Sequence, residues 1–262
     1  MKFDMRQVLF FFTMIGPGLI SAIAGNDAGG IATYSVAGAR FGYALLWTLI
    51  PLTVFLIIIQ EMCSRMGVVT GKGLADLIRE NFGLKTTLIL MCGLFIANFA
   101  TTVSEFAGMA AASELLGLNK YLVVLGAAVF VILLIIKVEY KILERVFLFM
   151  CLFYLTYVVS GILANPNWHI VLRNTASPTF IFDKSYLILL VGIIGTTITP
   201  WMQFYLQASI VEKGVKIKEY IYAKWELILG CVVTNAIAFF IILATATTLF
   251  PRGIVIETAA EA

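Results

Sequence analysis

Long apolar runs are the feature that most constrains how this chain can fold. Runs of roughly 18 or more apolar residues recur along the whole sequence, and about 20 helical residues cross a hydrocarbon layer of ~30 Å. Charged residues make up 13% of the chain, about half the share found in an average soluble domain. The sequence therefore predicts an all-α polytopic membrane protein whose surroundings are the lipid bilayer.

The apolar runs and the short polar connections between them predict seven membrane spans. We expect the spans at roughly 8–39, 43–66, 86–116, 121–138, 143–164, 186–211 and 225–249. The longest connection, 165–185, is expected to be a solvated outer loop that carries Trp168 and the lone His169. A net charge of +3 over so many spans gives no reason to expect nucleic-acid binding.

Basic residues alternate between the two sides of the predicted membrane. Thirteen of the 18 Lys and Arg residues fall on the side of the N-terminus. The other five are Arg40, Lys120, Arg173, Lys184 and Arg252. The positive-inside rule therefore predicts a cytoplasmic N-terminus, and we expect the protein in the plasma membrane.

Two of the predicted spans contain helix-breaking residues near their middle. The first carries AGNDAGG at residues 24–30, where three glycines surround Asp27. The sixth carries GIIGTTITP at residues 192–200, where two glycines precede Pro200. Interrupted helices five spans apart are typical of transporters built from inverted repeats, which hold their substrate at the bilayer midplane. We therefore expect a broken-helix, LeuT-like transporter fold.

The expected repeats define the domain organisation. Residues 1–164 are predicted to form a first five-helix repeat with a discontinuous first helix, and residues 165–185 an extracellular loop. Residues 186–262 are predicted to begin the second, inverted repeat. Because two five-helix repeats need at least ten spans, we expect the chain to be truncated after its seventh helix.

Two carboxylates are predicted to lie inside the membrane. A charged side chain there costs several kcal/mol, and it is usually retained for a partner or a task. Asp27 lies beside unwound backbone, where its negative charge suits a cation. Glu105 in the third span is either a second electrostatic element near the ion route or a structural acceptor for a neighbouring helix. Glu61 is expected to form a helix-end ion pair with Arg65, four residues later.

Several motifs occur in the order found in one transporter family. They are GPG at 16–18, Asp27-Ala28-Gly29-Gly30, FGYALLW at 41–47, QEMCSRMGVVTGKGLADLIRE at 60–80, PWMQFYLQAS at 200–209 and VTNAIAF at 233–239. With these motifs the chain resembles the NRAMP family of divalent-metal transporters over essentially its whole length. The resemblance implies a broken-helix transporter that moves a divalent metal ion, not an enzyme, with no catalytic residues and no cofactor.

The resemblance also implies a metal site. In the family, an aspartate and an asparagine of the first break join a methionine thioether and a backbone carbonyl of the sixth span. These positions correspond here to Asp27, Gly30, Thr199 and about Thr196. Relative to the family pattern, one residue is added between Pro200 and Tyr205, and this addition brings Gln203 into the expected metal set.

Other positions of the resemblance are expected to lie along the ion route. Asn26 precedes the aspartate, Trp201 replaces a family histidine, and Thr102 replaces an acid three residues before Glu105. The family is thought to use that histidine and that acid for proton movement, so their replacement leads us to expect transport without proton coupling.

The replaced methionine bears on which ion is carried. A thioether favours transition-metal ions, whereas hydroxyl, carbonyl and carboxylate oxygens suit Mg²⁺ and Ca²⁺. Mg²⁺ usually keeps several waters and therefore needs a roomy site with few protein ligands. The pattern resembles the divergent magnesium-transporting subgroup, so the expected activity is uptake of Mg²⁺, and also of Mn²⁺, without protons.

Three alternatives remain at this point. The first is a proton-coupled Mn²⁺/Fe²⁺ carrier in which Glu105 serves the proton. The second is a sodium-coupled amino-acid symporter, which Asp27 disfavours because the substrate carboxylate would face the N-termini of half-helices. The third is a fragment that transports nothing.

Overall fold

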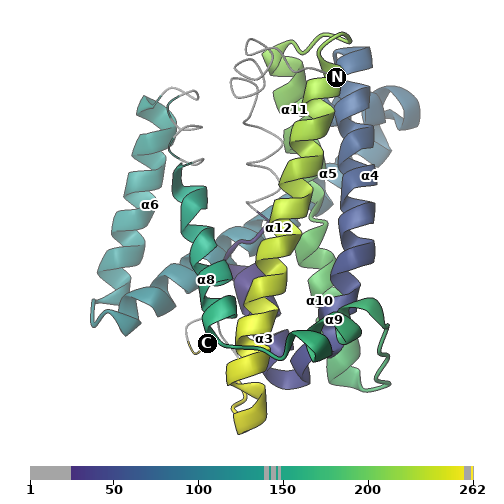
Figure 1. Cartoon of the computed structure of the whole chain (residues 1–262). Helices are drawn as coiled ribbons and strands as arrows, with labels where there is room; N and C mark the ends of the chain where they lie inside the picture. Colours follow the sequence, from purple (N-terminus) through teal and green to yellow (C-terminus); the bar gives the residue numbers. More distant parts are fainter. Residues whose placement is uncertain (1–24, 139–141, 143–145, 147–148, 257–260, 262) are drawn as a thin grey trace, which may run out of the picture. The chain divides into compact units, whose positions relative to one another are not determined.

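The chain is described by a computed structural model that covers residues 25–138, 142, 146, 149–256 and 261. All regular structure within these residues is helical (Figure 1). The elements are α3 (Ala28–Phe41), η1 (Gly42–Thr48), α4 (Leu49–Thr70), α5 (Leu74–Leu115), α6 (Lys120–Lys137), η2 (Cys151–Tyr154), α8 (Leu155–Leu163), α9 (Trp168–Ala176), α10 (Lys184–Thr197), α11 (Pro200–Lys213), α12 (Tyr220–Thr248) and η3 (Phe250–Arg252). The first part of the first predicted span lies outside the described residues.

The described chain divides into two compact units. The α11 unit contains residues 25, 52–98 and 198–235. The α3 unit contains residues 26–51, 99–197, 236–256 and 261. The chain passes from one unit to the other at both predicted breaks, after Gly25 and after Thr197. The expected division into inverted repeats concerns internal symmetry and stays a prediction.

The glycine pair after Asp27 lies inside a helix and not in a break. Residues 25–27 are not helical, and α3 begins at Ala28, so Gly29 and Gly30 belong to its first turn. The expectation that these two glycines unwind the helix is therefore wrong. Asp27 caps the helix instead, because its side chain accepts a hydrogen bond from the Gly30 amide.

Small residues at the start of α3 allow α5 to approach closely. A methyl group added at Gly29 would lie 3.2 Å from Ser104 Oγ, and one added at Gly108 would lie 2.6 Å from the Ala28 Cβ. Such contacts between small residues are the usual way in which membrane helices come together. Gly29 therefore serves packing between α3 and α5.

The second predicted break is confirmed, and it too is shorter than expected. Helix α10 continues through Gly192 and Gly195 to Thr197, and α11 begins at Pro200. Only Ile198 and Thr199 separate the two helices. Proline has no amide to donate and disfavours helical backbone in the preceding residue, so the interruption is fixed by Pro200 and not by the glycines.

The third predicted span, 86–116, agrees with the part of α5 that follows a kink. Helix α5 starts at Leu74 and joins two helices at Gly83, whose backbone is not helical (φ 79°). Arg79 lies in the short helix before the kink, and Lys85 lies at the start of the long helix after it. The left-handed backbone at Gly83 favours glycine, since it has no Cβ.

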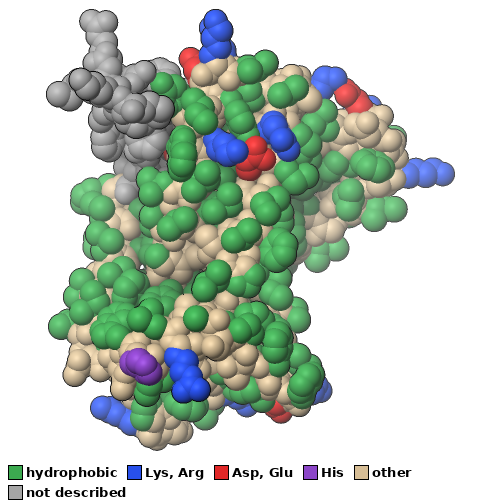
Figure 2. Space-filling model, turned by 45° about the vertical axis from the view of Figure 1, so that its right-hand side comes forward, with side chains coloured by type: hydrophobic (Ala, Val, Ile, Leu, Met, Phe, Trp, Pro, Cys, Tyr) green, Lys and Arg blue, Asp and Glu red, His purple; other side chains and the backbone are tan. Residues whose placement is uncertain are grey.

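Among the described residues, five helical stretches are long and apolar enough to cross a membrane. They are Ala28–Thr70, Leu74–Leu115, Lys120–Lys137, Lys184–Lys213 and Tyr220–Arg252, with a shorter apolar stretch at Cys151–Leu163. The seven predicted spans correspond to these stretches, because Ala28–Thr70 joins the first two spans through the 3-10 turn η1 and Cys151–Leu163 represents the fifth. Hydrophobic side chains are widespread on the surface in Figure 2, as expected for a protein in lipid.

The predicted outer loop contains a helix. Within residues 165–185, α9 runs from Trp168 to Ala176 and is capped by the Asn167 side chain. Val171 of α9 is buried, and α9 packs against η1. The expectation of a plain loop is wrong here, although His169 is exposed as expected.

The α11 unit has a hydrophobic core that includes the side-chain amide of Gln60. Gln60 of α4 donates to Met202 Sδ (3.7 Å) and accepts from Cys231 Sγ (3.6 Å). All three residues are fully buried, and both sulfur residues belong to the core of this unit. At the end of α4, Glu61 lies 3.8 Å from both Arg65 and Lys224, so the expected ion pair is present.

We expect Gly38→Ala to destabilise the α3 unit. A methyl group there would lie 2.5 Å from the Ile242 carbonyl oxygen of α12 and would also collide with Thr245. Overpacking of this kind costs about 1–3 kcal/mol. The apparent melting temperature of the purified protein in detergent should therefore fall.

Gly93→Ala is the matched control for this substitution. Gly93 is also helical, but an added methyl group there would meet no atom within 4 Å. The control should leave the melting temperature unchanged or slightly raised, since alanine favours helix by roughly 0.5–1 kcal/mol. Equal melting temperatures for the two variants would contradict the close packing of α3 on α12.

Candidate metal centre

Asp27 lies at the N-terminus of α3 in the α3 unit. Its Oδ1 atom accepts from the Gly30 amide at 2.6 Å, and its carbonyl accepts from the Ile31 amide at 2.8 Å. Its second carboxylate oxygen has no hydrogen-bond partner in the part of the chain that the structure describes. Asp27 therefore caps the helix with one oxygen and keeps the other available for a ligand.

Glu105 of α5 lies at the same end of α3. Both of its carboxylate oxygens lie within hydrogen-bond distance of the Ala28 amide, at 3.2 and 3.4 Å. Of the two roles considered for Glu105, this contact matches that of an acceptor for a neighbouring helix. Two carboxylates thus meet at the positive end of one helix dipole, which favours negative charge there.

Asn26 is tied to the fifth predicted span. It is fully buried, and its carbonyl accepts a hydrogen bond from the Tyr154 hydroxyl at 2.9 Å. Tyr154 ends the 3-10 turn η2, and no sequence pattern indicates that its side chain would reach the residues before α3. The backbone just before α3 is thereby held by a side chain from another element of the same unit.

Helices α3 and α10 run antiparallel within the α3 unit. Phe41 at the end of α3 stacks edge-on against Tyr186 at the start of α10, with ring centroids 5.4 Å apart. Tyr34 nearer the start of α3 bonds Thr197 at the end of α10, with 2.9 Å between the oxygens. The N-terminus of α3 and the C-terminus of α10 therefore lie at the same end of the pair.

The two helix ends offer different chemical groups. The last four carbonyls of a helix have no intrahelical partner, and Thr196 belongs to that last turn of α10. Asp27 and Gly30, also predicted as metal-site residues, lie at the N-terminus of α3, whereas the last residue of α10 contacts α3 at Tyr34, about two turns farther along. A carboxylate and exposed carbonyl oxygens are ligands that a hard cation prefers.

The other predicted metal residues lie at the start of α11, in the α11 unit. Thr199 is the N-cap residue of α11, yet its side chain makes no capping bond. Its Oγ1 atom is buried and has no hydrogen-bond partner among the described residues. Since a hydroxyl at this position usually caps the helix, Thr199 has an oxygen available for another group.

Gln203 and Trp201 turn toward their own helix and unit. The Gln203 amide, with its nitrogen toward the backbone, donates to the carbonyls of Thr199 and Pro200 at 2.5 and 2.7 Å. Trp201 packs against the core of the α11 unit and lies edge-on to Tyr205, with ring centroids 6.0 Å apart. Both contacts lie on the first turn of α11, so they shape the backbone around Thr199.

Metal ligands of other kinds are scarce in the described residues. They contain no group of three or more His, Cys, Asp or Glu side chains that could hold a metal ion. Any cation held near α3 would therefore be bound mainly by backbone and hydroxyl oxygens, together with one or two carboxylates. Such a set suits a hard or borderline divalent ion that keeps part of its water shell.

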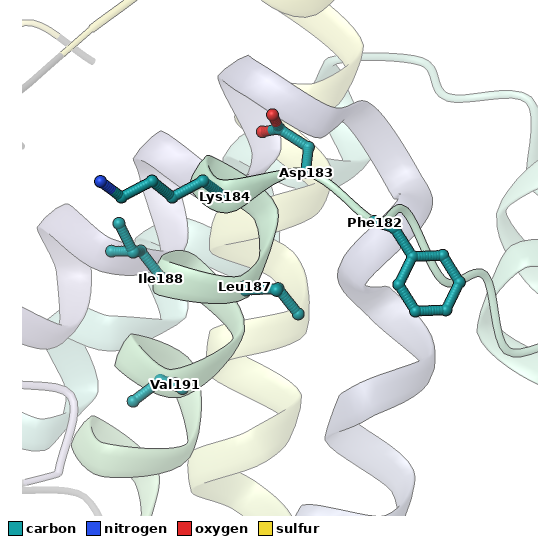
Figure 3. A pocket seen from close by; sticks show the side chains of 6 residues that line it. All are labelled: Phe182, Asp183, Lys184, Leu187, Ile188 and Val191. Carbon is teal, nitrogen blue, oxygen red and sulfur yellow. The ribbon is translucent and has the colours of Figure 1, made fainter.

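A surface pocket of about 500 Å³ lies at the start of α10, away from these residues (Figure 3). Asp183 in this pocket caps α10 by accepting from the Ser185 amide at 2.9 Å. The remaining lining is apolar except for Lys184, and Phe182 is almost fully exposed. This pocket holds none of the predicted site residues.

Tyr34 and Thr197 were missed by the sequence reasoning. Tyr34 follows Asp27 by seven residues, and Gly30 by four, so a helical wheel places it on the same face of α3. Thr197 is one of three threonines around the second break. Helical spacing could have found Tyr34, but nothing in the sequence says which threonine meets it.

Known proteins resemble this chain in sequence over most of its length. The family model described as "Natural resistance-associated macrophage protein-like" (Nramp) matches residues 18–262. A protein named "Divalent metal cation transporter MntH" from Verminephrobacter eiseniae (strain EF01-2) is 33% identical over 203 residues. The match covers 76% of this chain and 46% of that protein.

Solved structures show the same fold. A crystal structure of a mutant Eremococcus coleocola manganese transporter matches with a TM-score of 0.75 and 22% identity, covering 95% of this chain and 52% of that one. Another, with an aromatic bis-isothiourea compound, matches with a TM-score of 0.72 and 23% identity, covering 96% and 52%.

The chain thus spans about half the length of the relatives that it matches. The structural matches confirm the all-helical, LeuT-like transporter fold, and the family match, which covers nearly the whole sequence, confirms the predicted resemblance. The chain belongs to the NRAMP family of membrane metal-ion transporters.

Proposed function

We propose that this chain carries the ion-binding half-helices of a divalent metal cation transporter. The observation that carries the proposal is the Asp27 carboxylate at the N-terminus of α3, in the same unit as the C-terminal turn of α10. The names of the relatives support it, because one is a divalent metal cation transporter and another a manganese transporter. The proposed ligands are Asp27 and the Thr196 carbonyl, and the family resemblance adds the Thr199 hydroxyl.

The occupied amides of α3 argue against an amino-acid symporter. Ala28 and Gly30 already donate to Glu105 and Asp27, so these amides are not available to a substrate carboxylate. Two carboxylates at this helix end would also repel an anionic group. A cation is the better match to both facts.

Mn²⁺ is the first cargo to consider, because a named relative transports manganese. Carboxylate, carbonyl and water ligands suit Mg²⁺, Ca²⁺ and Mn²⁺ alike. No sulfur ligand stands at residue 199, where the family resemblance places a methionine. We therefore propose that the site accepts Mg²⁺ as well as Mn²⁺, with the magnesium-transporting subgroup as the finer assignment.

The membrane potential alone can drive such uptake. Moving two charges through 100 mV releases about 4.6 kcal/mol. The replacement of the family's histidine by Trp201 and of its acid by Thr102 supports uptake without protons. The competing candidate is a proton-coupled Mn²⁺ carrier that uses Glu105, which the manganese-transporting relatives favour.

We predict that Asp27→Asn weakens Mn²⁺ binding by at least about tenfold. Asparagine is as good an N-cap as aspartate, so the substitution removes the negative charge while keeping the helix cap. Binding can be measured from the loss of the free Mn²⁺ electron paramagnetic resonance signal. The melting temperature should stay near that of the wild type.

Asp183→Asn is the matched control, because Asp183 caps α10 in the same way at a distance from the site. It should bind Mn²⁺ like the wild type. Unchanged Mn²⁺ binding by Asp27→Asn would remove Asp27 from the site, and equal losses in both variants would assign the effect to helix capping.

Thr199→Met should shift the ion preference away from Mg²⁺. A thioether is a soft ligand that tolerates Mn²⁺ but competes poorly for Mg²⁺. Excess Mg²⁺ should inhibit ⁵⁴Mn²⁺ uptake into proteoliposomes by the wild type and should inhibit the variant much less. Ile198→Met, at the neighbouring residue, is the control for an added thioether. If excess Mg²⁺ does not inhibit ⁵⁴Mn²⁺ uptake by the wild type, the proposal that the site binds Mg²⁺ is refuted.

Uptake of Mn²⁺ or Mg²⁺ should leave the lumenal pH of the proteoliposomes unchanged. A pH-sensitive dye inside vesicles clamped at negative potential measures this directly. Acidification that follows the metal and is lost in Glu105→Gln would establish the proton-coupled alternative instead. Glutamine keeps an oxygen that can accept from the Ala28 amide, so the variant tests the ionisable proton separately from the helix contact.

A further inference from the structure

Tyr34 places a hydroxyl in the interior of the α3 unit. Its side chain is fully buried, and its oxygen lies 2.9 Å from Thr197 Oγ1, which is buried as well. The two residues are 163 positions apart in sequence and join α3 to the last residue of α10. A tyrosine hydroxyl at such depth usually has a specific partner.

The direction of this hydrogen bond follows from the protons available. Thr197 has one hydroxyl proton and lies 2.7 Å from the Ile193 carbonyl, which can only accept. The Thr197 proton therefore goes to Ile193, and the Tyr34 hydroxyl must donate to Thr197. Two consecutive hydrogen bonds therefore connect α3 to the last turn of α10, from the Tyr34 hydroxyl to Thr197 and from the Thr197 hydroxyl to the Ile193 carbonyl.

This hydrogen bond joins α3 and α10, the two helices that carry Asp27 and the Thr196 carbonyl. Thr197 is the last helical residue of α10, next to Thr196 and its carbonyl. Tyr34 stands about two turns from Asp27 along α3, a rigid helix. A fixed contact between Tyr34 and Thr197 therefore fixes how far the Asp27 carboxylate lies from the carbonyl end of α10.

We propose that Tyr34 is a positioning residue that sets ion specificity through its hydrogen bond to Thr197. The inference rests on the proposed cation transport and adds a residue that does not itself touch the ion. Mg²⁺ demands near-ideal octahedral geometry at 2.0–2.1 Å, whereas larger divalent ions accept looser arrangements. Loosening the α3–α10 pair therefore harms Mg²⁺ binding more than Mn²⁺ binding.

The same unit contains a matched pair for comparison. The Tyr43 hydroxyl lies 2.9 Å from Thr247 Oγ1, and Thr247 donates to the Leu243 carbonyl four residues earlier at 2.7 Å. The chemistry is that of Tyr34 and Thr197, but the bond joins η1 to α12 and involves neither half-helix end. Tyr43→Phe thus removes the same kind of hydrogen bond elsewhere in the unit.

The test compares Tyr34→Phe with Tyr43→Phe in the full-length protein. Mn²⁺ binding is followed by electron paramagnetic resonance, and Mg²⁺ binding by its competition with Mn²⁺. We expect Tyr34→Phe to weaken Mg²⁺ binding about tenfold and Mn²⁺ binding by less than about threefold. Tyr43→Phe should leave the ratio of the two affinities at the wild-type value.

Substitutions on α10 test the same bond from its other side. Thr197→Val removes the accepting hydroxyl and should reproduce the change in the Mg²⁺ to Mn²⁺ ratio, even if Tyr34→Phe does not fold. Thr197→Ser keeps the hydroxyl and should restore the wild-type ratio. A double variant, Tyr34→Phe with Thr197→Val, should shift the ratio no further than either single change.

The outcomes separate this inference from the proposed function. A wild-type protein that binds neither Mn²⁺ nor Mg²⁺ would overturn the proposed function. A wild-type protein that binds both ions, with an unchanged ratio in Tyr34→Phe and Thr197→Val, would overturn the role of Tyr34 alone. Equal ratio changes in Tyr34→Phe and Tyr43→Phe would likewise assign the effect to general loosening of the unit.

Discussion

A helix that ends inside a hydrocarbon layer leaves backbone amides and carbonyls that water cannot reach, and each of them needs a partner. This constraint governs both breaks in the chain. At the start of α3, the Gly30 and Ala28 amides are taken by Asp27 and Glu105. At the end of α10, the last four carbonyls have no partner within their own helix. Carboxylates at one helix end and carbonyl oxygens at the other are the groups on which the proposed cation site depends.

The packing around the breaks explains how two interrupted helices can be held in place. Small residues let α5 approach the first turn of α3, where Gly29 and Gly108 leave no room for larger side chains. Hydroxyl groups then fix the backbone, since Tyr154 binds the Asn26 carbonyl and Tyr34 binds Thr197. In an apolar surrounding, such buried hydrogen bonds are few and specific, and each ties together elements distant in sequence.

Much of this could be predicted from residue patterns. Asp27 in one apolar run and Pro200 in another were enough to predict two breaks and a cation site. A charge inside the membrane is rarely retained without a partner or a function, and proline ends or kinks a helix. The extent of the breaks was predicted wrongly. Gly29, Gly30, Gly192 and Gly195 all lie within helices, since glycine weakens a helix without ending it when neighbouring helices support the backbone.

The sequence by itself determined that the chain crosses a membrane, that a helix is interrupted just before Pro200, and which family the chain belongs to, because hydrophobic run length and proline act locally. Tertiary structure alone decided which groups meet at the interruptions. The partnerships of Ala28 with Glu105 and of Tyr34 with Thr197 span 77 and 163 residues. They follow from the packing of α3 against α5 and α10, and no local pattern records which side chains that packing brings within hydrogen-bond distance.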